Sequence, residues 1–146
     1  MREVFKKINI KNIIKRFLLI FVVLLFLELF FKLIIFKKIE FDSLINIVLL
    51  SSITSSIISI VTGIFNKKTN NVIISIILFI TGFLFSVQIV FYNTFKTFFS
   101  LSILGLGDQL ESFMKETIQA IIDNLLYIVI AFIPFILYLI LKKKIN

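Results

Sequence analysis

The stretch FLLIFVVLLFLELFFKLIIF occupies residues 17–36 and decides the class of fold. An α-helix needs about 20 apolar residues to cross the hydrocarbon core of a bilayer, and this stretch is long enough. Three further apolar runs follow, at residues 43–65, 72–92 and 121–141. In lipid, a helix satisfies its own backbone hydrogen bonds without closing a barrel. The sequence therefore predicts an all-α, polytopic membrane protein with four transmembrane helices.

The composition excludes a soluble fold. Of 146 residues, 60% are hydrophobic and 16% are charged, and the mean hydropathy is +1.12. A soluble domain is closer to half apolar and a quarter charged. The net charge of +8 does not indicate nucleic acid, because a phosphate-binding face must be water-soluble. The sequence has no Cys and no His, so thiol chemistry and the commonest general base are excluded. We predict no catalytic, cofactor-binding or metal-binding residue.

If the four spans cross the membrane in alternating directions, each charged residue outside them or at their ends is assigned to one of the two membrane sides. The first side carries Arg2, Lys6, Lys7, Lys11, Lys15, Arg16, Lys67, Lys68, Lys142, Lys143 and Lys144. The other side carries Lys37, Lys38, Lys96 and Lys115 with Glu40, Asp42, Asp108, Glu111, Glu116 and Asp123. Cytoplasmic loops are enriched in Lys and Arg. The pattern predicts that both termini lie in the cytoplasm.

Residues 1–16 precede the first span and are strongly basic. Apolar residues at positions 1, 4, 5 and 8 recur at helical spacing between lysines, which predicts a cytoplasmic amphipathic helix on the inner leaflet. Such a helix either recognises anionic lipid, at about 1 kcal/mol per basic residue near the surface, or anchors the topology. We favour the anchor. Residues 142–146 form the cytoplasmic tail at the other end of the chain.

Two charged residues, Glu28 and Lys32, lie inside the first span. They are four residues apart, so they share one helix face and can form an intramembrane pair. Charges at this depth cost roughly 2.5–3.5 kcal/mol and often mark functional sites. The alternative, which we favour, is a structural pair in which Lys32 extends toward the nearby outer interface.

Small residues form stripes on the second and third spans. They recur every three or four residues, a spacing that lets helix backbones approach closely in lipid. A polar conduit is the alternative, but a hydroxyl stripe without charge or amide groups more often serves packing. The predicted packing residues are Ser52, Ser56, Ser59, Gly63, Gly82 and Ser86.

Residues 93–120 form a long extracytoplasmic connection. Gly105 and Gly107 interrupt it, and a capping-box spacing at Asp108 then predicts an amphipathic helix over residues 108–120, resting on the outer leaflet. Aromatic residues gather where the connection begins, as at membrane interfaces. This segment is either an ordinary connector or a platform that receives a lipid headgroup or an extracytoplasmic domain. The residues of a headgroup platform would be Tyr92, Lys96, Phe99 and Ser100.

Several short elements, in order, resemble the membrane region of the lipoteichoic acid synthase family of low-GC Gram-positive bacteria. These elements are Phe41-Asp42-Ser43-Leu44, Val87-Gln88-Ile89-Val90-Phe91-Tyr92, Thr97-Phe98-Phe99-Ser100-Leu101 and Ile133-Pro134-Phe135-Ile136-Leu137-Tyr138. The likeness extends from residue 41 to residue 138, about two-thirds of the chain. Each element is short and apolar, and their order carries most of the resemblance.

The resemblance implies a five-helix membrane domain joined to an extracytoplasmic domain of the sulfatase and alkaline-phosphatase type. That domain is a metal-dependent transferase with a Thr nucleophile, which moves glycerol phosphate from phosphatidylglycerol onto an anionic polymer or glycolipid. The chain departs from this pattern, because it ends at Asn146 before a fifth helix and before any catalytic domain. No catalytic or metal-binding residue can therefore be carried over to it.

These considerations lead to one expectation and one alternative. We expect the truncated or separately encoded N-terminal membrane part of such a transferase, in a bacterial plasma membrane. It would anchor the enzyme and present a lipid donor. Its partners would be membrane lipids, including phosphatidylglycerol, and an extracytoplasmic catalytic domain; no cofactor and no nucleic acid are expected. The alternative is a stand-alone small polytopic protein, such as a holin-like or transporter-accessory subunit.

Overall fold

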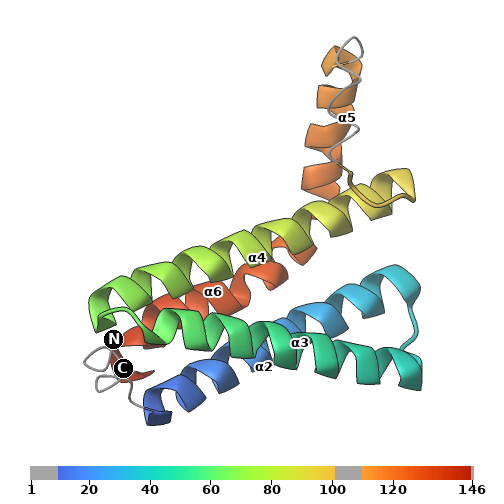
Figure 1. The fold of residues 1–146 in the computed structure, drawn as a ribbon. Helices are drawn as coiled ribbons and strands as arrows, with labels where there is room; N and C mark the ends of the chain where they lie inside the picture. The colour runs from blue at the N-terminus through green and yellow to red at the C-terminus, as the bar shows by residue number, and fades with distance from the viewer. Residues whose placement is uncertain (1–9, 101–109, 146) are drawn as a thin grey trace.

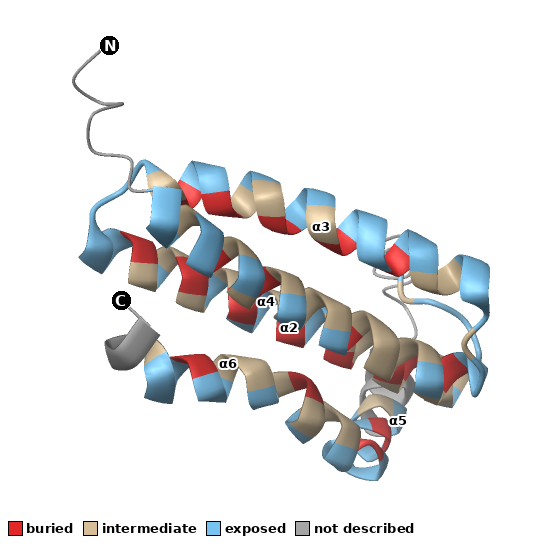
Figure 2. Cartoon of the chain, turned by 90° about the horizontal axis from the view of Figure 1, so that it is seen from below, coloured by how far each residue is buried: buried red, intermediate tan, exposed pale blue. Residues whose placement is uncertain are grey.

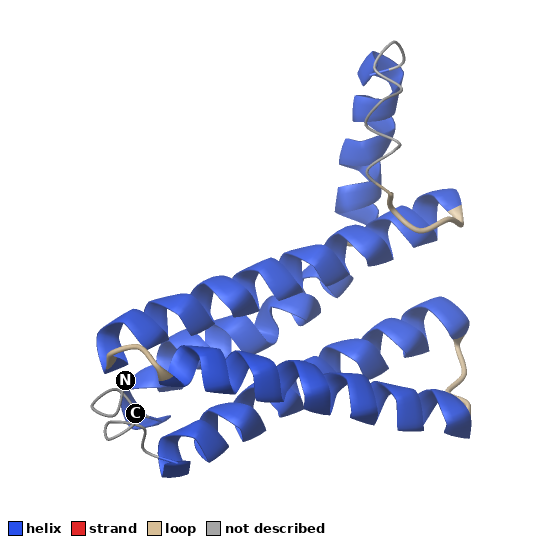
Figure 3. Cartoon of the chain, in the orientation of Figure 1, coloured by secondary structure: helices blue, strands red, loops and turns tan. Residues whose placement is uncertain are grey.

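A computed structural model describes the backbone of residues 10–100 and 110–145, and the side chains of residues 10–100 and 116–142. Every regular element in this part of the chain is an α-helix. The helices, labelled as in Figure 1, are α2 (Ile10–Phe36), α3 (Phe41–Gly63), α4 (Lys67–Phe95), α5 (Leu110–Asp123) and α6 (Leu125–Ile145). Short loops join α2 to α3 and α3 to α4 (Figure 3).

The predicted all-α fold with four spanning helices is confirmed. Four helices, α2, α3, α4 and α6, are long and apolar enough to cross a membrane. Only 11% to 28% of the residues in the most apolar stretch of each helix are buried. Figure 2 shows exposed faces along all four helices, and these faces carry large apolar side chains such as Leu50 and Ile140. In water this surface would be a large exposed apolar patch, whereas lipid hydrocarbon solvates it.

Helix boundaries differ from the predicted spans by several residues, for example at the starts of α2 and α6. Helix α2 begins at Ile10, seven residues before the predicted span, so the basic residues from Lys11 to Arg16 belong to the same helix. The predicted fourth span begins at residue 121, but residues 121–123 belong to α5, and α6 begins at Leu125. The predicted amphipathic segment of residues 1–16 is described only from Ile10 onward, and its first nine residues lie outside the described part of the chain.

The spanning helices associate as two pairs (Figure 1). Helix α2 packs along α3, and α4 packs along α6, while contacts between α2 and α4 join the pairs. The small core lies where α2, α4 and α6 meet. It consists of Ile74, Leu78 and Tyr138, with Leu19, Val23 and Phe135 packed against them. Helix α5 runs across the direction of α4 and α6 rather than along it (Figure 1).

The two ends of the bundle differ in chemistry. We call the end where α2 begins, α3 joins α4 and α6 ends the basic end; its described basic residues are Lys11, Lys15, Arg16, Lys67, Lys68 and Lys142. We call the opposite end the aromatic end, after the rings of Phe31, Phe36, Tyr92 and Phe98. Both helices that end there, α2 and α4, are followed by a lysine in the left-handed conformation, at Lys37 and Lys96.

The buried stripe of α3 is shifted by one residue from the predicted one. The residues of α3 that face the bundle are Ile47, Ser51, Ser55, Ser59 and Thr62. Ser52, Ser56 and Gly63 flank this stripe and are half-buried, and Ser59 belongs to both sets. Small and hydroxyl-bearing residues lie on adjacent faces of this helix, so spacing alone leaves more than one of these faces suitable for packing.

Gly82 marks the closest approach between α4 and α6. A Cβ atom built on Gly82 would lie 3.1 Å from the carbonyl oxygen of Ala131. Because that oxygen belongs to the backbone of α6, it cannot move aside like a flexible side chain. Ser86, one turn further along α4, is buried on the same side and donates its hydroxyl to the Gly82 carbonyl at 2.8 Å. Small residues therefore let this pair of helices pack closely.

We predict that Gly82→Leu forces α4 and α6 apart and lowers the free energy of unfolding by roughly 1–3 kcal/mol, as overpacked interfaces do. Unfolding in mixed detergent micelles, followed by circular dichroism, measures this loss. The control is Phe83→Leu, because the Phe83 side chain is 52% exposed and the change should cost less than about 0.5 kcal/mol. Equal stability of the two variants would contradict the close contact.

Candidate functional site

A buried arginine joins three helices at the basic end. Arg16 of α2 is 8% exposed, and its Nη1 donates to the carbonyl oxygen of Thr62 in α3 at 3.4 Å. With the Asn70 amide oriented to satisfy its neighbours, the Asn70 oxygen accepts from Arg16 Nε at 2.6 Å and from Nη2 at 2.8 Å. The Asn70 nitrogen then donates to the Oγ1 and carbonyl oxygen of Thr62, each at 3.3 Å. Arg16, Thr62 and Asn70 form what we call the arginine cluster.

A second hydrogen bond strengthens the contact between α2 and α3 beside the arginine cluster. The hydroxyl of Ser59 donates to the carbonyl oxygen of Ile13 at 2.6 Å. The other hydroxyls on the spanning helices mostly donate within their own helix, as Ser56 does to the Ser52 carbonyl at 2.7 Å. Ser59 is therefore a packing residue of the predicted stripe that also forms an interhelical hydrogen bond.

The arginine cluster is suited to holding helices together rather than to chemistry. The partners of the guanidinium are neutral oxygens, and the structure shows no ion pair to Arg16 among the described residues. Buried charges are stable only when their hydrogen bonds are satisfied. Here the guanidinium of Arg16 donates to acceptors on both α3 and α4. The cluster contains no candidate nucleophile with an adjacent general base.

Asn70→Ala should lower the free energy of unfolding by about 2–3 kcal/mol, because it removes hydrogen bonds to a buried charged group. The measurement is detergent-mediated unfolding of the full chain. Thr69→Ala is the matched control, since Thr69 is exposed in the same turn of α4. If both variants lose the same stability, the arginine cluster does not hold the three helices together.

At the aromatic end, rings from separate elements form one cluster. Phe31 of α2 contacts Phe85 of α4 at 5.7 Å between ring centroids, and it contacts Phe98 at 6.2 Å. Tyr92 contacts Phe98 at 5.0 Å and Phe36 at 6.4 Å. Aromatic residues of this kind prefer the headgroup depth of a bilayer. The cluster joins α2, α4 and the segment after α4.

The segment after α4 turns back on the helix and is held there by Gln88. The backbone reverses at Lys96, which has a φ of 56° and donates its N–H to the Tyr92 carbonyl at 2.9 Å. The Gln88 amide then makes two hydrogen bonds to the backbone of Phe99. Its nitrogen donates to the carbonyl oxygen at 3.2 Å, and its oxygen accepts from the N–H at 3.0 Å. We call this pair of bonds the Gln88 clamp.

A second amide fixes the corner between α5 and α6. Asn124 is buried, and its side-chain nitrogen donates to the Ala120 carbonyl at 2.9 Å. Its side-chain oxygen accepts from Asn93 of α4 at 2.7 Å. The bond to Ala120 occurs at the point where α5 ends, and the bond to Asn93 ties this corner to α4. The direction of α5 is therefore set by Asn93 of α4 and by Asn124 at the corner itself.

The predicted headgroup platform occupies this rigid region. Tyr92 and Phe99 are half-buried, and Lys96 and Ser100 are exposed. The Lys96 Nζ donates to the Asn93 carbonyl at 2.9 Å. Turn geometry and the Gln88 clamp bring Tyr92, Lys96 and Phe99 into one small region. Gln88 was not among the predicted site residues, although an amide inside an apolar run is a signal for a specific partner.

An apolar cavity of about 250 Å³ adjoins the platform. It lies between α4, the segment after it, α5 and α6. Its lining includes Phe91, Phe95, Phe99, Thr117 and Ile121. The platform thus combines an exposed ammonium group with an adjacent hydrocarbon-lined space.

Glu28 and Lys32 are both half-buried on α2. They lie close enough to interact electrostatically, but the structure shows no salt bridge between them. Lys32 instead lines a cavity of about 150 Å³ that also contacts Lys38 and Glu40. The Lys38 Nζ lies 2.6 Å from Glu40 Oε1. This hydrogen bond raises the pKa of Lys38 and lowers the pKa of Glu40.

The described helices define a polytopic helical membrane protein, with four helices long and apolar enough to cross a bilayer. Among the residues that the structure describes, no group of three acidic side chains could hold a metal ion. Comparison with models of known families, with curated proteins and with solved structures finds no significant match. Nothing in these comparisons links the chain to the lipoteichoic acid synthase family.

Proposed function

We propose that the chain is a membrane-anchored module that presents an anionic phospholipid at its aromatic end. The observation that carries the proposal is the Gln88 clamp, which fixes Phe99 while leaving Lys96 exposed beside it. An ammonium group at headgroup depth suits a lipid phosphate, because Lys acts as a compact point charge. A rigid backbone around that lysine lowers the cost of ordering it on binding.

The surroundings of Lys96 fit the two parts of a phospholipid. The Ser100 hydroxyl lies in the same exposed segment and is a hydrogen-bonding group of the kind a headgroup needs. The cavity lined by Phe99 and Thr117 has apolar walls that suit part of an acyl chain. Phosphatidylglycerol is the proposed lipid, since it combines a phosphate charge with hydroxyl groups. In this proposal the aromatic end faces the outside of the cell, in keeping with the positive-inside rule.

The proposed partner is an extracytoplasmic transferase domain that uses the presented lipid as a donor of glycerol phosphate. Support for this partner comes from the resemblance of residues 41–138 to the membrane region of lipoteichoic acid synthases. In support of a docking role, α5 runs across the bundle at the same end as the platform (Figure 1). A helix in that position could contact a domain outside the membrane.

A photoreactive phosphatidylglycerol should crosslink to residues 92–100 in membranes that contain the full chain. We expect Lys96→Gln to reduce this crosslinking about fivefold, the effect expected of one basic residue near anionic lipid. Gln88→Leu should reduce it as well, because it removes the two hydrogen bonds that hold Phe99. Mass spectrometry of the labelled peptides measures the change. The matched control is Lys37→Gln, which removes the other left-handed lysine of the aromatic end.

Cysteine labelling of cells that contain the chain tests which side of the membrane the aromatic end faces. Because the chain has no cysteine, Thr97→Cys should react with an impermeant reagent in intact cells, and Asn66→Cys only after permeabilisation. Crosslinking that is unchanged in Lys96→Gln and Gln88→Leu, or labelling of Asn66→Cys alone in intact cells, would contradict the proposal.

The proposed transferase partner makes a genetic prediction. The DNA that follows codon 146, or an adjacent gene, should encode a hydrophobic helix and then a metal-binding domain with a Thr nucleophile. Sequencing of the locus tests this directly. A neighbourhood without any such domain would favour a stand-alone polytopic protein, and lipid presentation would then be tested by crosslinking alone.

A further inference from the structure

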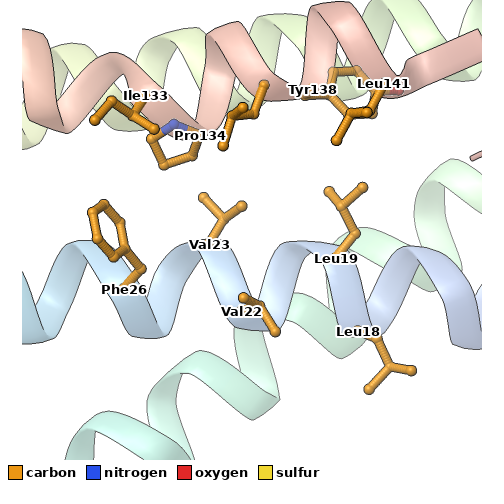
Figure 4. A pocket seen from close by; sticks show the side chains of 10 residues that line it. Leu18, Leu19, Val22, Val23, Phe26, Ile133, Pro134, Tyr138 and Leu141 are labelled. Atoms are coloured by element: carbon orange, nitrogen blue, oxygen red, sulfur yellow. The ribbon is translucent and has the colours of Figure 1, made fainter.

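A groove about 540 Å³ in volume runs between α2 and α6, starting from the basic end. In Figure 4, Leu19, Val23 and Phe26 of α2 point toward Pro134 and Tyr138 of α6 across this space. The described wall is hydrocarbon apart from the Tyr138 hydroxyl, which already contacts Asn71 Oδ1 at 3.4 Å. The groove therefore offers no site for a polar ligand along its length.

The depth of the groove matches one leaflet of a bilayer. On α2 its lining extends from Leu18 to Phe26, and on α6 from Ile133 to Leu141, so the ends of each wall are eight residue steps apart. At a helical rise of about 1.5 Å per residue this is about 12 Å. Half of a hydrocarbon core of about 30 Å is close to that length. The groove thus ends near the middle of the membrane.

Basic residues flank the groove at its basic end. Lys15 lies one helical turn before Leu18, and Lys142 directly follows Leu141. Lys15 is exposed and Lys142 is half-buried. Glu28, the one acidic residue on the described part of α2, lies beyond Phe26 at the deep end. Positive charge at the mouth and hydrocarbon below it match an anionic headgroup and its acyl chain.

The shape and lining of the groove favour lipid over another helix. A partner helix would pack along a full span and would prefer small residues at the contact. This groove covers only about a third of α2, and its described lining contains no Gly, Ala, Ser or Thr. Branched and aromatic side chains leave space between them that a flexible chain can fill.

We propose that this groove is a binding site for one anionic phospholipid of the leaflet at the basic end. One acyl chain lies between α2 and α6, and the headgroup lies between Lys15 and Lys142. This site is separate from the platform at the aromatic end, so it extends the proposed function to a second lipid in the opposite leaflet. A lipid held here would fill the gap between the two helix pairs.

Tryptophan quenching tests the proposal, because the chain has no Trp of its own. Phe26→Trp places the probe in the groove. Ile53→Trp is the control on α3, where Ile53 is 57% exposed. The two positions lie at a similar depth in the bundle. Arg16 and Thr62 are in contact, Phe26 lies ten residues from Arg16, and Ile53 lies nine residues from Thr62. The full chain is reconstituted in mixtures of phosphatidylglycerol and phosphatidylcholine in which only one of the two lipids is brominated at a time.

At Phe26→Trp, we expect phosphatidylglycerol to associate at least about fivefold more strongly than phosphatidylcholine, the preference that one basic residue supplies. At Ile53→Trp the ratio should be close to one. Adding Lys15→Gln and Lys142→Gln should abolish the preference, whereas adding Lys67→Gln and Lys68→Gln should preserve it. Equal ratios at both probes would overturn the proposal. So would a groove probe shielded from both lipids, because that result means that protein covers the groove.

Discussion

The hydrogen bonds from Arg16 to Asn70 and Thr62 are the interaction on which the arrangement of the first three spanning helices depends. Lipid supplies no hydrophobic force that drives one apolar helix against another, so close packing and interhelical hydrogen bonds must hold the bundle. A guanidinium can donate in several directions at once. One side chain of α2 therefore contacts both α3 and α4, and it keeps the hairpin of α2 and α3 beside α4.

Close packing and interhelical hydrogen bonds also hold the other parts of the bundle together. Gly82 brings α4 and α6 together by close packing, because a larger residue would meet the Ala131 carbonyl. Asn124 uses a hydrogen bond to hold the corner between α5 and α6 against α4. Where neither acts, as between α2 and α6, the helices leave a lipid-sized groove. The distribution of small and amide-bearing residues thus decides where the bundle is tight and where it is open.

The two ends of the bundle serve different surroundings. At the basic end, charge is concentrated on helix ends around one buried arginine. At the aromatic end, rings and a reversed segment lie beside the exposed Lys96. The proposed lipid sites follow this division, because each pairs positive charge at one end with hydrocarbon-lined space beside it.

Sequence alone determined the number of spanning helices, because a run such as residues 17–36 is long and apolar enough to cross lipid only as a helix. It also singled out Gly82, Ser86 and Ser59 as predicted packing residues, since small residues are conspicuous in an apolar span. Sequence did not decide which face of α3 is buried, because hydroxyl groups lie on several adjacent faces of that helix. By charge pattern alone, Arg16 belongs with the basic residues that predict the membrane orientation. Only the tertiary structure shows that Arg16 points into the bundle and that Gln88 holds Phe99. These roles depend on partners 46 and 11 residues away, and no local pattern specifies such pairings.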